Sequence, residues 1–228
     1  DDVVREVLGV VSEAPRPSGA AVAAVRRLRR LFGRMLGSGL SDSERLGLVA
    51  ELALLGEILM QDAQFPVEAW RGPLREPHDF EGPTRCVEVK AVGDGSSNIQ
   101  INGLDQLTQH DRRPLLLILV WVASDPEGMT LHDIVDQVRE LAGDQVAALD
   151  ERLNAAGWTR EDNVSTGYAI GNVKAIPVAD DVPRLAPDLD RPHLLDGVFD
   201  VSYRLDVAAI LPFATTTTLA QAARGLWE

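Results

Sequence analysis

The chain is poor in cysteine, and it lacks long apolar runs and any clear pattern of metal-binding histidines. Its 228 residues include one cysteine, Cys86, which excludes an internal disulfide and a cysteine-based metal cluster. The four histidines show no spacing typical of metal ligands. The longest apolar run, Leu115 to Ala123, is too short to span a membrane, and no N-terminal stretch has the pattern of a signal peptide. We therefore expect a cytoplasmic protein with no membrane partner.

Basic side chains are also scarce relative to acidic ones, so the formal net charge is -13. Such a charge argues against a protein that coats nucleic acid non-specifically, because that kind of binding depends on cationic side chains. The charge is uneven, however, since residues 14–40 hold six arginines and no acid. This N-terminal arginine cluster is equally compatible with a phosphate-facing surface and with a solvated helix face. Its members are Arg16, Arg26, Arg27, Arg29, Arg30 and Arg34.

The hydrophobic pattern predicts a central block made of a helix, three strands, a second helix and a strand. The first helix should be buried, because apolar residues cover most of its circumference. The last strand should be buried on both faces, because it is continuously apolar. In chain order, these six elements are expected at residues 41–61, 78–81, 85–91, 98–102, 104–110 and 115–122.

Further elements are expected on both sides of this block. A helix over residues 20–37 precedes it, in a segment that begins with Asp1 and is therefore expected to lack its true start. The weaker pattern after the block predicts helices and strands at residues 131–141, 144–156, 168–178, 198–211 and 218–226. The expected divisions are an N-terminal helical segment, a core, and a C-terminal extension of helices and strands packed on the core, over residues 1–40, 41–123 and 124–228.

Two carboxylates and a lysine are expected to converge where the first two strands of the central block lie side by side. Glu88 and Lys90 should point to the same face, because side chains alternate along a strand. A turn at Gly82-Pro83 would let the segment that carries Asp79 lie beside that strand. Hard cations such as Mg²⁺ prefer carboxylate oxygens, and a neighbouring ammonium can orient water or stabilise charge on a phosphate. The combination predicts a metal-dependent hydrolytic site.

The scarcity of lysine and the position of Glu51 bear on the same site. Lys90 and Lys174 are the only lysines in the chain, so a lysine two residues after Glu88 favours a role that arginine cannot serve. The alternative is a surface salt bridge between Glu88 and Lys90. Glu51 lies among leucines on its helix, where a carboxylate costs stability unless a cation pairs with it. The alternative is a glutamate at the edge of the apolar stripe that reaches solvent.

The motifs together resemble the PD-(D/E)xK nuclease superfamily, whose core is a helix, three strands, a helix and a strand. More narrowly, the chain resembles a bacterial family of PD-(D/E)xK motif proteins found in restriction-modification and phage-defence gene clusters. The resemblance is close over residues 41–122 and loose elsewhere. One departure is His78 before the aspartate, with the proline one place earlier at Pro77. The matching segments are Gly47 to Leu55, Trp70 to Pro73, His78 to Phe80, Glu88 to Lys90 and Asp105 to Leu107.

This resemblance implies the fold and a role for each site residue. The fold would be α/β and restriction-endonuclease-like, with a mixed sheet flanked by helices and with helical and β extensions. Asp79, Glu88 and Glu51 would be ligands of Mg²⁺ or Mn²⁺, and Lys90 would be the catalytic lysine. Gln106 matches a glutamine that the family carries near the site on the following helix.

The function that these observations predict is a Mg²⁺-dependent DNA endonuclease, as a subunit of a bacterial restriction or phage-defence system. Its expected partners are DNA and other defence-system subunits, such as an ATPase or a methyltransferase, since the chain has no Walker motif. A homodimer is also compatible with the sequence. One alternative is a catalytically silent DNA-binding or scaffold subunit, against which the intact Asp79, Glu88 and Lys90 set argues. A second alternative is an acidic DNA mimic, which fits the net charge but not the arginine cluster.

Overall fold

The described part of the chain covers most of its length beyond the N-terminal segment. The chain divides into residues 1–41 and 42–228, and the fold below is that of the second part. The helix expected over residues 20–37 and the N-terminal arginine cluster lie outside the described residues. No helix among the described residues is long and apolar enough to cross a membrane. The computed structural model describes residues 39–109, 113–161, 165–186, 195–196, 198, 200–224 and 226.

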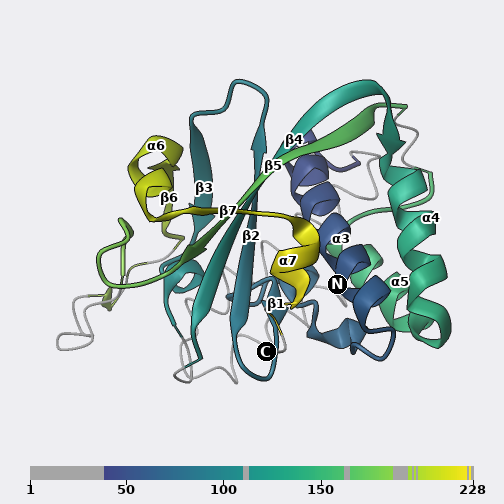
Figure 1. The fold of residues 1–228 in the computed structure, drawn as a ribbon, viewed down its shortest axis with the longest axis horizontal. Helices are drawn as coiled ribbons and strands as arrows, with labels where there is room; N and C mark the ends of the chain where they lie inside the picture. The colour runs from purple at the N-terminus through teal and green to yellow at the C-terminus, as the bar shows by residue number, and fades with distance from the viewer. Residues whose placement is uncertain are drawn as a thin grey trace, which may run out of the picture. The chain divides into compact units, whose positions relative to one another are not determined.

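The unit is built on a five-stranded mixed sheet (Figure 1). In sheet order, its strands are β1 (Phe80–Glu81), β2 (Cys86–Gly93), β4 (Leu115–Thr130), β5 (Gly167–Pro177) and β7 (Thr215–Thr217). β2 and β4 run parallel, while the other neighbouring pairs are antiparallel. A parallel pair requires a crossover connection, so the chain must leave the sheet between β2 and β4. The expected α/β class with a mixed sheet flanked by helices is confirmed.

One face of the sheet is covered by helix α3 (Asp42–Gln61), which contacts β2 and β4. Its apolar residues are buried around most of the helix, as the sequence predicts. Helices α4 (Leu131–Ala142) and α7 (Leu219–Arg224) pack against α3 in turn. Figure 1 shows α3, α4 and α5 (Val146–Ala156) together on this side of the sheet.

The opposite face carries a two-stranded antiparallel ribbon of β3 (Asn98–Asn102) and β6 (Ser202–Asp206) (Figure 1). Ile99 and Ile101 of β3 both point into the core against Leu117 and Leu119 of β4, as their alternation predicts. The strand expected over residues 198–211 is wrong in its extent. It ends where the Asp206 side chain accepts a hydrogen bond from the Ala208 amide and starts α6 (Val207–Ile210).

Two more expectations about the central block need correction. The helix expected over residues 104–110 is a single 3₁₀ turn, η3 (Asp105–Leu107), and Thr108 after it is extended, with its hydroxyl donating to the Leu104 carbonyl at 2.7 Å. β4 begins at Leu115 as predicted but continues to Thr130, beyond the boundary drawn after residue 123. It continues because β5 pairs with it along most of its length, with register shifts between Val120 and Val122 and between Ser124 and Met129.

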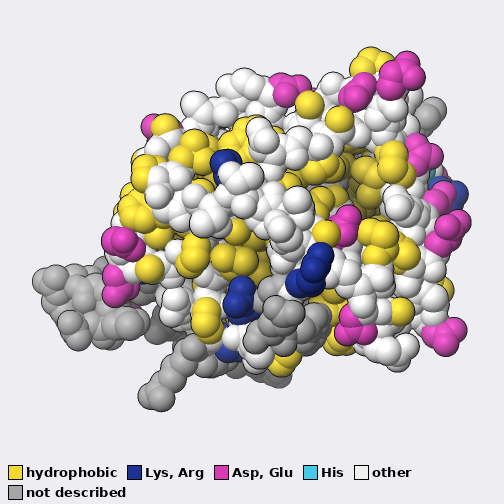
Figure 2. Space-filling view, viewed as in Figure 1, with side chains coloured by type: hydrophobic (Ala, Val, Ile, Leu, Met, Phe, Trp, Pro, Cys, Tyr) yellow, Lys and Arg dark blue, Asp and Glu magenta, His cyan; other side chains and the backbone are white. Residues whose placement is uncertain are grey.

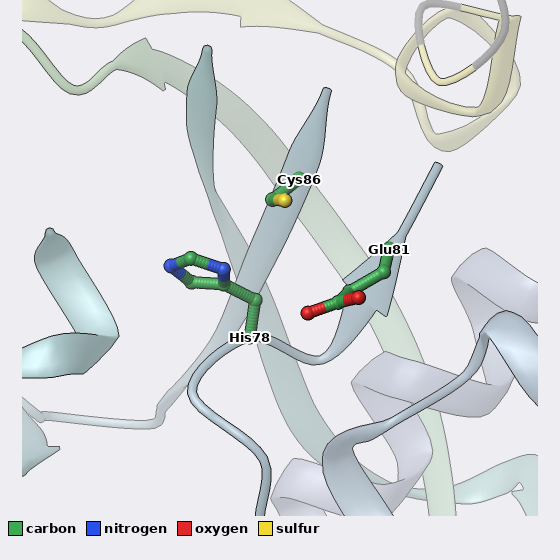
Figure 3. A group of neighbouring side chains, drawn as sticks. All are labelled: His78, Glu81 and Cys86. Carbon is green, nitrogen blue, oxygen red and sulfur yellow. The ribbon is translucent and has the colours of Figure 1, made fainter. Parts of the chain in front are cut away.

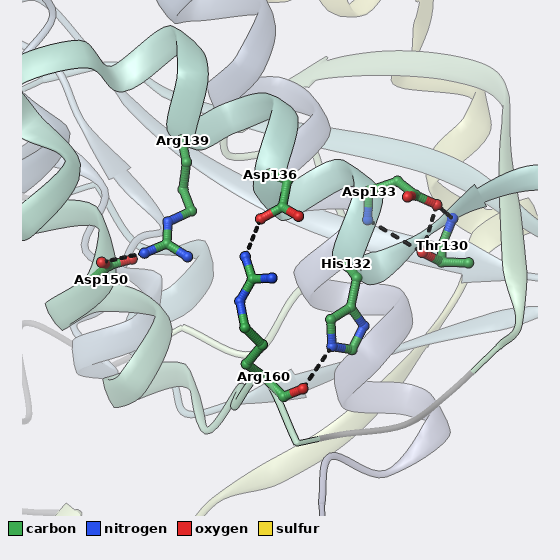
Figure 4. A network of polar contacts seen from close by, with 7 residues as sticks. All are labelled: Thr130, His132, Asp133, Asp136, Arg139, Asp150 and Arg160. Atoms are coloured by element: carbon green, nitrogen blue, oxygen red, sulfur yellow. Dashed lines mark hydrogen bonds and ion pairs between the residues drawn. The ribbon is translucent and has the colours of Figure 1, made fainter.

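Helices α4 and α5 are joined by polar contacts on their exposed side (Figure 4). Arg139 of α4 donates to Asp150 of α5 at 2.7 Å, and Thr130 caps α4 through a reciprocal capping box with Asp133. α5 also contacts two short turns, η1 (Val67–Ala69) and η2 (Gly72–Leu74). Arg152 of α5 donates from Nε to the Trp70 carbonyl at 3.0 Å. The helical layer therefore fixes the loop that leads from α3 to β1.

Candidate active site

Asp79 is held between this loop and strand β2. The amides of Arg71 and Gly72 both donate to its main-chain carbonyl, at 2.7 and 3.1 Å. Its side-chain Oδ2 accepts a hydrogen bond from the Val89 amide at 2.8 Å. Because Oδ2 is tied to β2, the other carboxylate oxygen, Oδ1, is the one directed toward the rest of the site. The carboxylate is buried, with 9% of the residue exposed.

Glu88 and Lys90 lie on one face of β2, as strand alternation predicts. They pair with Leu117 and Leu119 of the parallel strand β4, whose side chains belong to the core. Glu88 Oε1 lies 2.7 Å from Lys90 Nζ, which is within ion-pair and hydrogen-bond distance. Glu88 is fully buried, and its Oε2 has no partner in good hydrogen-bond geometry among the described residues, although the Asp79 amide acts on the carboxyl group and lowers its pKa. The pair is therefore not the surface salt bridge that the sequence left open.

Gln106 of η3 fixes the ammonium of Lys90 from the other side. Its Oε1 accepts from Lys90 Nζ at 3.1 Å and from the Asn102 amide at 2.8 Å. The amide bond ties the glutamine to the end of β3. Lys90 keeps 14% of its side chain exposed, so it lies where the buried carboxylates meet the surface.

Glu51 enters the site from α3. Its Oε2 accepts a hydrogen bond from the indole Nε1 of Trp70 at 2.7 Å. A β-carbon added at Gly72 would lie 2.6 Å from Glu51 Oε2 and 2.5 Å from Asp79 Oδ1. Gly72 therefore lies between the carboxylates of Glu51 and Asp79. Because glycine has no side chain, the space between their oxygens stays open. Glu51 is directed to this space and not toward solvent at the edge of its helix.

The crowding of these groups shifts their protonation. Burial raises the pKa of Glu51 well above its usual range, and the nearby Asp79 adds to the effect. Burial, together with repulsion from Asp79, raises the pKa of Glu88 to about 8. Burial also raises the pKa of Asp79, against the opposing effect of Lys90. Burial alone would lower the pKa of Lys90, but Glu88 and Asp79 outweigh it and leave it raised, so Lys90 stays protonated.

The site thus gathers three carboxylates around one ammonium. All five residues predicted as site residues come together, and none lies elsewhere on the fold. A single positive charge does not compensate two buried acids and the partly exposed Glu51, and this shortfall agrees with the raised pKa values of all three carboxyl groups. The oxygens that remain available are Asp79 Oδ1 and Glu88 Oε2, with Glu51 across the gap at Gly72. Carboxylate oxygens in this number fit a hard divalent cation such as Mg²⁺ or Mn²⁺.

Sequence reasoning missed the contributions of Trp70 and Gly72. Trp70 is fully buried, and its indole nitrogen donates a hydrogen bond to Glu51. The sequence did contain one indication, because Trp70 to Pro73 is among the segments that match the family, but no function was assigned to that segment. His78, which stands where the motif has proline, is buried, with its Nε2 3.0 Å from the Thr108 carbonyl oxygen.

Comparison with known families gives a match over most of the chain. A family model described as "Putative PD-(D/E)XK family member, (DUF4420)" matches residues 1–208, which is most of the chain. No curated protein and no solved structure matches the chain. The five-stranded mixed sheet with flanking helices is consistent with a restriction-endonuclease-like fold. The chain therefore belongs to the PD-(D/E)xK family, whose members are generally nucleases.

Proposed function

We propose that this protein is a Mg²⁺-dependent DNA endonuclease that acts in a bacterial restriction or phage-defence system. The observation that carries the proposal is Glu88, a fully buried carboxylate beside two further acids, with one oxygen that has no donor in good hydrogen-bond geometry among the described residues. Buried polar atoms are rarely left unsatisfied unless a ligand or a catalytic role accounts for them. A divalent cation would supply the missing partner and the missing positive charge in one step.

The residues that would hold the cation are Asp79, Glu88 and Glu51. Asp79 already has one oxygen tied to the Val89 amide, which fixes the direction in which Oδ1 points. The hydrogen bond from Trp70 fixes Glu51 in the same way. When bound, Mg²⁺ polarises the scissile phosphate and lowers the pKa of the water that attacks it. Ligands that are pre-oriented in this way reduce the reorganisation needed when the substrate binds.

Lys90 would contribute a fixed positive charge rather than a base. Its raised pKa keeps it protonated, so it cannot accept a proton from water at neutral pH. Glu88 and Gln106 hold Nζ from two sides, at 2.7 and 3.1 Å. In that position it can orient the attacking water and stabilise charge that develops on a phosphate oxygen. Its partial exposure lets a substrate phosphate approach it.

The family and the net charge support DNA as the substrate and a partner that delivers it. With a net charge of -13, the chain repels phosphate over much of its surface. Figure 2 shows acidic side chains spread around the margin of one face, with few basic ones between them. We therefore propose that DNA contacts run through the N-terminal arginine cluster, an additional defence-system subunit, or both. The bacterial family that the sequence resembles is the basis for the defence role.

The experiment is a plasmid-nicking assay with Mg²⁺ or Mn²⁺, using full-length protein with and without its genetic neighbours. Asp79→Asn, Glu88→Gln and Lys90→Ala should each lower cutting by at least about 100-fold, as for loss of one electrostatic catalytic group. Lys90→Arg keeps the charge but should also fail, because a planar guanidinium cannot replace a compact ammonium held by two partners. Circular dichroism would confirm that each variant remains folded.

Lys174→Ala and Glu127→Gln are matched controls, because they remove a lysine and an acid that take no part in the site. Both should cut like the parent. If parent and site variants all bind DNA but none cuts under any metal condition, the chain is a silent DNA-binding subunit. If none binds DNA and the protein instead blocks a DNA-binding partner, the acidic mimic is correct. Equal cutting by parent and all site variants would show that another site is responsible.

A further inference from the structure

A second group of ligand-type side chains lies beside the site just described, formed by His78, Glu81 and Cys86 (Figure 3). One nitrogen, oxygen or sulfur atom from each residue lies within 4.8 Å of the other two. Glu81 and Cys86 are direct partners across the β1–β2 pair, so their side chains share one face. His78 comes three residues before Glu81 and turns back toward the same place. The sequence spacing did not indicate this group, because a short turn between β1 and β2 creates it.

The orientation of His78 suits a metal ligand. Its Nε2 lies 3.0 Å from the Thr108 carbonyl oxygen, which can only accept, so Nε2 must carry the proton. The neutral ring then offers the lone pair of Nδ1 as a ligand. Histidines that bind metals usually donate their other ring N–H to a carbonyl or carboxylate in this way, which fixes the tautomer and the ring orientation. His78 and Cys86 are each only 1% exposed, so both have little freedom to turn away.

We propose that His78, Glu81 and Cys86 bind a zinc-type transition metal ion, separate from the Mg²⁺ site. The donor set of imidazole nitrogen, carboxylate oxygen and thiolate sulfur suits Zn²⁺, whereas Mg²⁺ does not take sulfur. Three protein ligands and one water would complete a tetrahedron. Bonds of about 2.0–2.3 Å place tetrahedral ligand atoms roughly 3.5 Å apart, so closure from 4.8 Å needs a movement of about 1 Å. Glu81 can supply this movement because it is partly exposed.

The contact that Glu81 must give up is weak. Its Oε2 lies 3.6 Å from Arg113 Nη2, and the two side chains are 27% and 24% exposed. An ion pair of this length and exposure contributes little to stability, so a metal ion can replace it. Arg113 keeps a separate hydrogen bond from Nη1 to the Gly82 carbonyl at 3.0 Å.

The ion would fix the position of the chain segment that carries Asp79. His78 and Glu81 lie on either side of Asp79 in the chain, and Cys86 begins the strand that continues to Glu88. Binding all three to one ion would fasten the segment that carries Asp79 to β2. This inference concerns the metal site alone and does not depend on the nuclease activity proposed above.

Cobalt substitution is a direct test, because Cys86 is the only cysteine in the sequence. Tag-free full-length protein is titrated with Co²⁺ under reducing conditions that do not chelate metal. Tetrahedral coordination through a thiolate gives a sulfur-to-cobalt charge-transfer band in the near ultraviolet and strong visible bands. We expect both, saturating at one equivalent per chain. Zn²⁺ should remove them, and excess Mg²⁺ should not.

Variants assign the ligands. Cys86→Ser should abolish the charge-transfer band, while His78→Gln and Glu81→Gln should each weaken Co²⁺ binding by at least tenfold. Glu81→Gln keeps the test valid if the two buried variants fail to fold, because Glu81 is partly exposed. Glu88→Gln is the matched control and should retain the band at full strength, which separates this site from the Mg²⁺ ligands. A parent that shows only weak octahedral absorption would overturn the proposal, as would loss of the band in Glu88→Gln or unchanged affinity in Glu81→Gln.

Discussion

Replacing Glu88 by glutamine should stabilise the metal-free protein at neutral and alkaline pH, although it removes a residue of the site. Burial raises the pKa of Glu88 from 4.5 to about 8, so the folded protein holds a proton there that the unfolded chain has lost. For a carboxyl with a raised pKa, the folded state binds more protons than the unfolded state between those two values. Stability therefore falls as pH rises from about 4.5 to 8. Glutamine has a similar shape and does not titrate, so the variant should lack this loss.

The size of the effect follows from the same shift. At pH 7.5, about three pH units above the unfolded pKa of 4.5, the cost of keeping the carboxyl protonated is about 4 kcal/mol, at about 1.4 kcal/mol per unit. A buried amide without partners would offset about 1–3 kcal/mol of the gain. We expect the variant to be more stable by about 1–3 kcal/mol at pH 7.5, and to lose this advantage near pH 5.

The assay is urea unfolding of parent and variant in metal-free buffer, at intervals between pH 5 and pH 8. Glu127→Gln, an exposed change on β4, should stay within about 0.5 kcal/mol of the parent throughout. Mg²⁺ at about 100 times its dissociation constant should then stabilise the parent by about 2.7 kcal/mol and Glu88→Gln by much less. A stability difference that does not grow with pH would refute the reasoning from burial. Equal Mg²⁺ stabilisation of both proteins would refute the ligand role.

Two other substitutions test the gap between Glu51 and Asp79. Gly72→Ala should lower nuclease activity by about 100-fold, because its β-carbon would lie 2.5–2.6 Å from both carboxylates, and displacements of about 1 Å can cost that much. Its control is Gly47→Ala on α3, where nothing lies within 4 Å; that change should stabilise the helix by about 1 kcal/mol and leave cutting intact. Trp70→Phe removes the donor to Glu51 and should lower stability by about 1–3 kcal/mol. It should also weaken the Mg²⁺-induced rise in melting temperature, and an unchanged rise would exclude a role for the indole in holding Glu51.

The elements that sequence predicts well are those whose packing partners impose a simple repeat. α3 is apolar around its circumference and is buried, and the alternation of β3 sends Ile99 and Ile101 to one side. β4 is continuously apolar where both faces are covered. Glu88 and Lys90 share a face because alternation is a property of any strand. The acidic and lysine members of the site were predictable for the same reason, together with the family resemblance that linked them to Asp79 and Glu51.

Tertiary structure decided the features that depend on residues distant in sequence. β6 is shorter than expected because Asp206 caps a following helix, and it pairs with β3 across about 100 residues of chain. η3 is only one turn long, yet Gln106 still reaches Lys90 because the end of β3 holds it.

The gap at Gly72 and the group of His78, Glu81 and Cys86 belong to the same class of feature. Periodicity reports which side of an element is buried, and it carries no information on which atoms meet there. The loop before β1 places the bare α-carbon of Gly72 between Glu51 and Asp79. The turn after β1 sets Glu81 opposite Cys86. Both arrangements exist only in the folded chain, because folding brings together side chains that sequence spacing leaves unrelated.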